Sequence, residues 1–258
     1  MRGCTKLFPF IVLGILSCTV VVGCGRMLRG GSSSNTQPSQ PSAKDIGDPL
    51  AITVIDSTQS VISRWSLIQQ ATSAFIAGAS KQRDFDLIVI RLDSFPKQEG
   101  PYYKSSAFTE DQWKKLETEF RRPGPEGEGT DQVRAMEEVI RAASGNGTEK
   151  PSSVVLLYFS DMLVDQPKGG SRASFAPWDT FKWERLKQAG ISQAQFYIMR
   201  ETSPEATPES RAAYRRQEEL IPLLRKAADS AGLNSQWILD SVLEDEVAKG
   251  RFTGPEIE

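Results

Sequence analysis

The sequence predicts an α/β protein with a doubly wound, mostly parallel sheet and helices on both faces, a Rossmann-like three-layer arrangement. From residue 50 on, short apolar runs alternate with stretches in which apolar residues recur every three or four positions. Residues 153–159 form a run that is apolar on both sides, which is typical of the centre of a parallel sheet. Strands that alternate with helices imply right-handed crossovers and two layers of helices.

Each element follows from its own pattern. Strands are expected over residues 51–55, 85–92, 153–159 and 195–199, and helices over residues 61–77, 108–120, 131–143, 180–188 and 208–231. Thr109 is a plausible N-cap of the second helix, and the third is expected to bury Val133, Met136, Ile140 and Ala143. Ser235 is expected to cap a last helix that runs to Lys249, so the end of the chain is predicted to be helical.

The 258 residues divide into four expected parts: a signal peptide over 1–23, a lipidated cysteine and flexible linker over 24–49, the main domain over 50–233, and a C-terminal helix and tail over 234–258. The linker is rich in Ser, Pro, Gln and Gly and has too few apolar residues to form a core. A composition of 39% hydrophobic and 25% charged residues fits one globular domain with an appendage.

Composition also excludes several classes of function. The chain has no His, which removes Ser-His-Asp and Cys-His catalysis and most zinc sites. Its three cysteines, Cys4, Cys18 and Cys24, all lie near the N-terminus, so the domain has no disulfide and no thiol nucleophile. A formal net charge of −2 without a basic cluster gives no indication of nucleic-acid binding.

The N-terminus has the pattern of an export signal: a basic start, an apolar stretch over residues 7–22, and then Val21-Val22-Gly23-Cys24. This end resembles a bacterial lipobox, which implies that Cys24 carries acyl chains such as palmitate and anchors an extracytoplasmic protein to the cell membrane or outer membrane. Each buried CH₂ contributes about 0.8 kcal/mol, so more than one chain anchors stably. An uncleaved signal anchor and a plain secretory signal are the alternatives.

Three polar segments stand at the ends of expected elements: two follow apolar runs, and one opens a helix. Asp56-Ser57-Thr58-Gln59-Ser60 comes after residues 51–55, Gly129-Thr130-Asp131 opens the helix over 131–143, and Ser160-Asp161 follows residues 153–159. In order and position these resemble the three loops of von Willebrand factor A-type (vWA) domains, which hold a cation in a metal-ion-dependent adhesion site (MIDAS). The family also has a short antiparallel strand and a sixth strand. Residues 101–106 fit the former only loosely, and no clear sixth strand is visible.

The resemblance implies hydroxyl ligands from Thr58, Ser60 and Thr130 and carboxylates from Asp56 and Asp161. Mg²⁺ prefers octahedral oxygen ligands at roughly 2.0–2.1 Å, which this set offers; Mn²⁺ would fit equally, and Ca²⁺ less tightly. With one coordination position open, an Asp or Glu of a protein partner completes the shell. The resemblance therefore implies a binding module and not an enzyme.

Other readings of the same residues stay open. Asp56 and Ser57 could cap the first helix, Thr130 could be the N-cap of its helix, and Asp161 could end a strand in a turn. One alternative is a metal-free scaffold lipoprotein of the envelope. Another is a metal-dependent phosphoryl-transfer hydrolase, but those enzymes usually have a second acid two residues after the first, where this chain has Thr58, and no phosphate-binding loop occurs.

Overall fold

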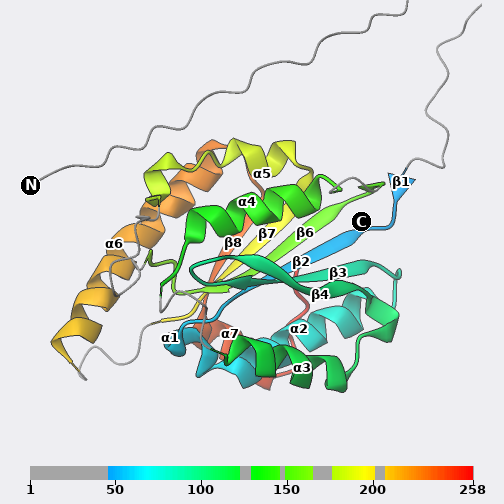
Figure 1. Cartoon of the computed structure of the whole chain (residues 1–258), viewed down its shortest axis with the longest axis horizontal. Helices are drawn as coiled ribbons and strands as arrows, with labels where there is room; N and C mark the ends of the chain where they lie inside the picture. The colour runs from blue at the N-terminus through cyan, green and yellow to red at the C-terminus, as the bar shows by residue number, and fades with distance from the viewer. Residues whose placement is uncertain (1–45, 123–128, 146–148, 165–175, 201–206, 258) are drawn as a thin grey trace, which may run out of the picture. The chain divides into compact units, whose positions relative to one another are not determined.

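A six-stranded sheet forms the centre of the protein (Figure 1). The structure, a computed structural model, describes residues 46–122, 129–145, 149–164, 176–200 and 207–257, which belong to one compact unit. The strand order is β4-β3-β2-β6-β7-β8, and among these strands only β4 runs antiparallel to its neighbour. The order reverses between β2 and β6, as in doubly wound folds. The strands are β2 (Leu50–Asp56), β3 (Asp86–Leu92), β4 (Lys97–Lys104), β6 (Val154–Ser160), β7 (Ile191–Ile198) and β8 (Ser235–Leu239).

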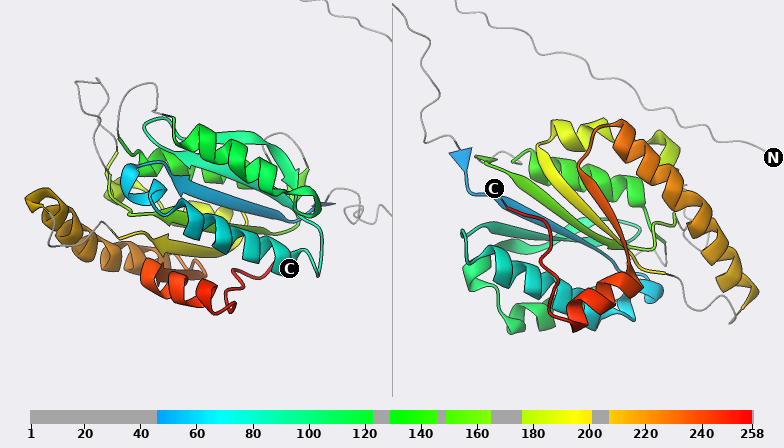
Figure 2. Two further views of the ribbon diagram at one scale, coloured as in Figure 1. Left: turned by 90° about the horizontal axis from the view of Figure 1, so that it is seen from below. Right: turned by 180° about the vertical axis from the view of Figure 1, so that it is seen from behind.

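Two layers of helices cover the sheet (Figures 1 and 2). On one face lie α4 (Gln132–Ala143), α5 (Glu184–Gln188) and α6 (Pro208–Ser230). On the other lie α1 (Gln59–Ile62), α2 (Trp65–Ala79), α3 (Glu110–Phe120) and α7 (Asp240–Ala248). Two short strands, β1 (Ile46–Gly47) and β5 (Lys150–Pro151), pair separately from the main sheet. The predicted three-layer α/β architecture is confirmed.

Alternation along the central strands builds both cores. In β2, Leu50, Ile52 and Val54 face the α4 side, while Ala51 and Ile55 face the α2 side. All of these side chains are buried, because successive residues of a strand point to opposite faces and both faces are covered. The same parity places Asp56 on the α4 side, at the carboxyl end of the strand.

The C-terminal segment differs from the prediction. Residues 235–239 form β8, which pairs in parallel with β7, so Ser235 begins a strand and does not cap a helix. The last helix, α7, starts at Asp240, and the sixth strand that the sequence did not reveal is present. Trp237 packs against Phe196 of β7, with ring centroids 4.4 Å apart, which provides the tertiary contact that favours a strand here. Figure 2 shows β8 at the edge of the sheet.

Two predicted helices are divided. The helix expected over 61–77 breaks at Ser63 and Arg64 into α1 and α2, and that expected over 180–188 becomes a 3₁₀ turn (Trp178–Thr180) followed by α5. The apolar repeat does not reveal such interruptions, since neither Ser63-Arg64 nor residues 181–183 include a Gly or Pro that would signal a helix end. The loosely fitting strand expected over 101–106 is the antiparallel β4, which begins earlier, at Lys97. Thr109 does cap α3, in a capping box with Gln112.

The predicted signal peptide, the lipidated Cys24 and the linker up to residue 45 lie outside the described residues. Within the described ranges, none of the helices has the length and apolar character needed to cross a bilayer.

Candidate metal centre

The predicted site residues lie where the central parallel strands end. We call this side of the sheet its carboxyl edge, and the side at which these strands begin its amino edge. β2 and β6 pair in parallel with Ile55 opposite Phe159, so Asp56 and Ser160 follow side by side on the same face. Asp56 pairs with Leu92 at the end of β3 on its other side. The loops after β2, β3 and β6 therefore meet at this edge, the usual ligand-binding end of such sheets.

Asp56 is fully buried, and each of its carboxylate oxygens accepts a hydrogen bond. Oδ1 accepts from the backbone N–H of Thr58 at 2.9 Å, which closes a turn at the start of α1. Oδ2 accepts from the hydroxyl of Ser160, 2.8 Å away and 104 positions later in the sequence. One oxygen thus shapes its own loop and the other ties that loop to β6.

Asp161 repeats this arrangement from the opposite loop. Its Oδ1 accepts from Leu163 N at 2.9 Å, and its Oδ2 lies 3.3 Å from the hydroxyl of Ser60, which donates to it. The reading of Asp161 as a turn residue is therefore correct, and the same side chain also reaches the first loop. Gln217 of α6 fixes the backbone here by donating to Asp161 O at 2.9 Å.

The hydroxyls of Thr58 and Ser60 lie 3.1 Å apart. Asp161 Oδ2, Ser60 Oγ and Thr58 Oγ1 therefore form a continuous row of oxygens with spacings of 3.3 and 3.1 Å. These are hydrogen-bond distances, and they also come within a few tenths of an ångström of the ligand–ligand edge of a Mg²⁺ octahedron, about 2.9 Å. The donor set is chemically suited to Mg²⁺ or Mn²⁺, whose preferred ligands are oxygens.

Thr130 is fully buried, and its hydroxyl has no hydrogen-bond partner among the described residues. It is not the N-cap of α4: that role belongs to Asp131, whose Oδ1 accepts from Arg134 N at 3.0 Å. Burying a hydroxyl without a partner is unfavourable, and such a group calls for an explanation. The hydroxyls of Thr53 and Thr72, two other buried threonines, also have no partner among the described residues, so the state of the Thr130 hydroxyl is compatible with a ligand role without demonstrating one.

The loop that carries Thr130 is held by the segment that follows β3. Asp131 N donates to Asp93 O at 3.0 Å, and Ser94 Oγ donates to Gly129 O at 3.3 Å. Asp93 in turn forms a buried ion pair with Arg91 Nε at 3.0 Å. Burial raises the pKa of Asp131, while its hydrogen bond from Arg134 N and the charge of Arg134 partly offset this.

Gln132 and Tyr158 were missed from the sequence, and both are buried beside the site. Gln132 Nε2 donates to Ser160 Oγ at 2.7 Å and to Leu163 O at 3.1 Å, and its Oε1 accepts from the hydroxyl of Tyr158 at 2.7 Å. A signal existed: Gln132 stands in line with the buried residues of α4, which are Ala135, Met136, Val139, Ala142 and Ala143.

The buried face of α4 was predicted only half correctly. The prediction included Val133 and Ile140, which are only partly buried, while Met136 and Ala143 are buried as expected. With the face placed one residue away, Gln132 falls outside the predicted core. The real stripe contains this one polar side chain, at the end of the helix nearest the candidate site.

Met162 occupies the position at which the vWA motif commonly has Gly. Its φ of 65° is the only positive value at a non-glycine residue in the described part of the chain. Positive φ costs an L-residue roughly 1–2 kcal/mol. The residue is held there by Met162 N donating to Ser160 Oγ at 2.9 Å and by Trp178 Nε1 donating to Met162 O at 2.8 Å, so the loop keeps the backbone that Gly would adopt without strain.

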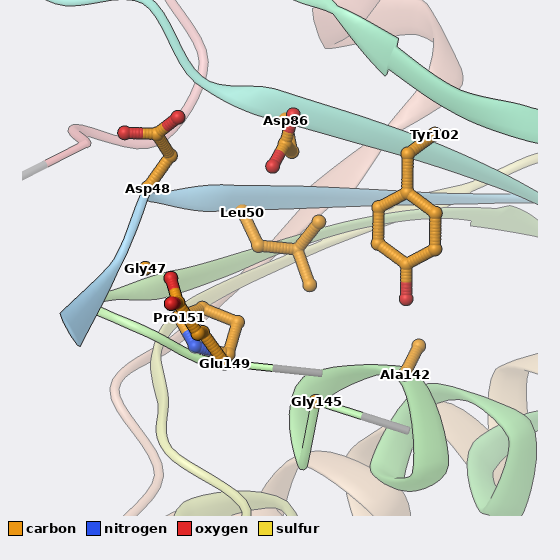
Figure 3. Close-up of a pocket in the computed structure, with 9 residues that line it drawn as sticks. All are labelled: Gly47, Asp48, Leu50, Asp86, Tyr102, Ala142, Gly145, Glu149 and Pro151. Atoms are coloured by element: carbon orange, nitrogen blue, oxygen red, sulfur yellow. The ribbon is translucent and has the colours of Figure 1, made fainter. Parts of the chain in front are cut away.

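A cavity of about 370 Å³ lies at the opposite, amino edge of the sheet (Figure 3). Asp48, Asp86 and Glu149 contribute carboxyl groups, and the ring of Tyr102 extends from β4 toward Ala142. None of the five candidate ligands lines it. Among the described residues, no group of three or more His, Cys, Asp or Glu has a metal-binding arrangement, and the site proposed at the carboxyl edge depends on two carboxylates with hydroxyls.

No protein-family model and no curated protein matches the chain. Solved structures similar to it include a von Willebrand factor type A protein from Catenulispora acidiphila, at 14% identity over 79% of this chain and 42% of that one, with a TM-score of 0.39. BatB from Bacteroides thetaiotaomicron shares 16% identity over 79% of this chain and 98% of its own, with a TM-score of 0.42. The manganese-loaded TRAP protein of Plasmodium vivax shares 13% over 83% and 76%, with a TM-score of 0.41.

At these identities and TM-scores the similarities add nothing to what the strand order already shows. The six strands, the single antiparallel strand β4 and the two helical layers have the arrangement expected from the vWA resemblance. The chain has a vWA-like fold.

Proposed function

We propose that this protein is a binding module that uses Mg²⁺ or Mn²⁺ at the carboxyl edge of its sheet to hold an acidic group of a protein partner. One observation supports this most directly: Thr58 Oγ1, Ser60 Oγ and Asp161 Oδ2, from loops 101 or more positions apart, form one row of hydrogen-bonded oxygens, and Asp56 accepts from the backbone N–H of Thr58 beside it. Thr130 adds a buried hydroxyl from the adjoining loop that has no partner among the described residues. A bound cation supplies an electrophilic centre to which a partner's carboxylate coordinates.

The proposal includes the anchor predicted from the N-terminus. Acyl chains on Cys24 would keep the domain at the bacterial cell membrane or outer membrane, on its extracytoplasmic side. The tether would be residues 24–45, shorter than the expected 24–49, because Ile46–Gly47 pairs with β5 and Asp48 with Lys104 in the folded domain. Metabolic labelling with a palmitate analogue tests this part, because Cys24→Ser would lose the label while Cys18→Ser would keep it. A label that persists in Cys24→Ser would contradict lipidation at this residue.

Thermal unfolding tests the metal site. We expect the melting temperature of the full chain to rise with Mg²⁺ or Mn²⁺ and to return to its starting value with chelator, since a ligand that binds only the folded state stabilises it. Asp56→Ala should abolish this response. Asp245→Ala, which removes an exposed carboxylate of α7 paired with Lys249, should keep it. A wild-type melting temperature that ignores both cations would contradict the metal site.

The partner is tested by capturing envelope proteins on the full chain with Mn²⁺ or with chelator, and with Asp56→Ala as the matched bait. A partner retained only by the wild type and only with Mn²⁺ is expected. Its binding should then be lost when its own Asp or Glu residues at the contact are changed to Asn or Gln. Equal retention in chelator would contradict a cation-mediated contact.

A metal-free scaffold is the second candidate. One observation favours it: Asp56 and Asp161 already accept hydrogen bonds at both carboxylate oxygens from the chain itself. The outcome of the thermal experiment separates the two. We propose no catalysis, because a hydroxyl, Thr58, stands where phosphoryl-transfer enzymes carry a second acid.

A further inference from the structure

A buried line of hydrogen bonds runs from the sheet to the candidate ligand Asp56. It passes from the hydroxyl of Tyr158 to Gln132 Oε1, from Gln132 Nε2 to Ser160 Oγ, and from Ser160 Oγ to Asp56 Oδ2, with donor–acceptor distances of 2.7, 2.7 and 2.8 Å. All four side chains are fully buried. None of the three residues behind Asp56 belongs to the predicted ligand set.

The direction of every hydrogen in this line is fixed. Leu163 O can only accept, so the group of Gln132 that faces it must be the NH₂, and its carbonyl oxygen must face Tyr158. Gln132 Nε2 and Met162 N can only donate to Ser160 Oγ, and together they occupy both lone pairs of that hydroxyl. The one hydrogen of Ser160 is therefore directed to Asp56 Oδ2.

We infer that Gln132 is a positioning residue for the candidate metal site: through Ser160 it fixes the place of the Asp56 carboxylate before any cation binds. The inference rests on the proposed function for its purpose, but its geometry does not depend on a metal. Ser160 that lacked the Gln132 amide would have a free lone pair, and its hydroxyl could rotate toward another acceptor. Asp56 would then lose its connection to β6.

The chain contains a matched control on the other face of the sheet. Gln195 of β7 also accepts from a buried tyrosine, Tyr197, and its amide donates to Gln236 of β8 at 3.1 Å. Neither Gln195 nor Tyr197 makes a described hydrogen bond to a candidate ligand. Gln195→Met and Tyr197→Phe thus remove the same kinds of groups as Gln132→Met and Tyr158→Phe, without touching the site.

The first measurement is made in chelator, so that it reports on position alone. Amide hydrogen exchange by NMR on the full chain follows Thr58 N–H, which bonds to Asp56, and Met162 N–H, which bonds to Ser160. We expect exchange at both amides to be roughly 2–10-fold faster in Gln132→Met, the change that corresponds to one lost hydrogen bond. The core amide of Ile52 should change no more than in Gln195→Met. Unchanged protection of Thr58 and Met162 would overturn the inference.

The second measurement is the affinity for Mn²⁺, read from the free-ion electron paramagnetic resonance signal. Loss of a group that orients a ligand typically lowers metal affinity by about 10–100-fold, which we expect for Gln132→Met and Ser160→Ala but not for Gln195→Met. Ser160→Thr, which keeps the hydroxyl, should restore binding. Equal affinity in wild type and Gln132→Met would overturn the inference and leave the proposed function intact.

Two safeguards keep the outcomes distinct. Should Gln132→Met fail to fold, Tyr158→Phe removes a single hydroxyl from the start of the line, and Tyr197→Phe is its control. Should the wild type bind no Mn²⁺, the proposed function fails, while the exchange rates in chelator still decide whether Gln132 positions Asp56.

Discussion

The two edges of the main sheet hold their carboxylates in different ways. At the amino edge, Asp48 and Asp86 share the ammonium group of Lys104, with N–O distances of 2.7 and 2.8 Å, and all three side chains remain partly exposed. The hydrogen bond to Asp48, followed by that to Asp86, raises the pKa of Lys104. At the carboxyl edge, Asp56 and Asp161 are buried and accept hydrogen bonds from hydroxyls and backbone amides.

The carboxylates of the amino edge belong to an ion pair, whereas those of the carboxyl edge belong to the candidate ligand set. A lysine neutralises a carboxylate, whereas hydroxyl and amide donors orient it without cancelling its charge. Buried carboxylates held in the second way are suited to a cation that enters from solution. The amino-edge cavity is also lined by carboxyl groups (Figure 3), yet two of its three acids, Asp48 and Asp86, already have a partner in Lys104.

The largest expected effect comes from the buried ion pair beside the carboxyl edge. Arg91 pairs with Asp93 and also donates to Glu119 O and Arg122 O, at 2.8 and 2.7 Å. Arg91→Met should lower the free energy of unfolding by about 3–5 kcal/mol, because it leaves a buried charge unpaired. Urea unfolding measures this. The exposed pair of Arg121 is the control, and Arg121→Met should cost less than about 1 kcal/mol. Equal losses would contradict the role given to burial.

A direct comparison of the edges uses two matched substitutions. At about a hundred times its dissociation constant, Mn²⁺ should stabilise the wild type by about 2.7 kcal/mol. Asp161→Asn should remove this increment, and Asp86→Asn should keep it, because only Asp161 belongs to the oxygen cluster. Urea unfolding with and without Mn²⁺ gives both values. A response that survives in Asp161→Asn would place the cation elsewhere.

Alkaline pH tests the burial of Tyr158 behind the carboxyl edge. Burial raises the pKa of Tyr158 well above its ordinary value, and the charges of Asp56, Asp131 and Asp161 raise it further. Above about pH 10 the unfolded chain releases this proton while the folded chain keeps it, so stability falls by about 1.4 kcal/mol per pH unit. Tyr158→Phe should make the decline shallower by that amount. A slope equal to that of the wild type would show that the phenol is reached by solvent.

The smallest effect is expected at the amino edge. Lys104→Met removes two ion pairs, with Asp48 and Asp86, whose side chains are between 28% and 55% exposed, and it should cost less than about 1 kcal/mol. Added salt should shrink the difference between wild type and variant, since screening acts on exposed charges. A loss that is large, or equal at low and high salt, would remove the contrast between the edges.

Much of the fold was predictable because its signals are local. The two-sided apolar run of β6 predicts a central parallel strand, the apolar run of β2 predicts another strand, and Thr109 predicts an N-cap for α3. Residues 235–239 were misread, since a Ser before an apolar run is equally consistent with a helix cap. The parallel pairing with β7 and the packing of Trp237 on Phe196 decide that this segment is a strand.

The candidate site, too, was predictable only in part. The order of Asp56, Thr58, Ser60, Thr130 and Asp161 along the chain, each beside a strand or helix end, was visible in the sequence. The spacing of Gln132 along α4 is consistent with burial, but its role was not visible in the sequence, because its partners Tyr158 and Ser160 lie on a strand more than 20 positions away. The burial of the Thr130 hydroxyl likewise depends on which segments cover it.

The sequence by itself determined the alternation of strands and helices and the polar residues at their ends, because these depend on neighbours within a few positions. Only the tertiary structure decided that Ser160 reaches Asp56 across 104 positions, that Ser60 reaches Asp161 across 101, and that β8 completes the sheet. The physical reason is that burial and hydrogen-bond satisfaction are properties of contacts between distant segments, which no local pattern specifies.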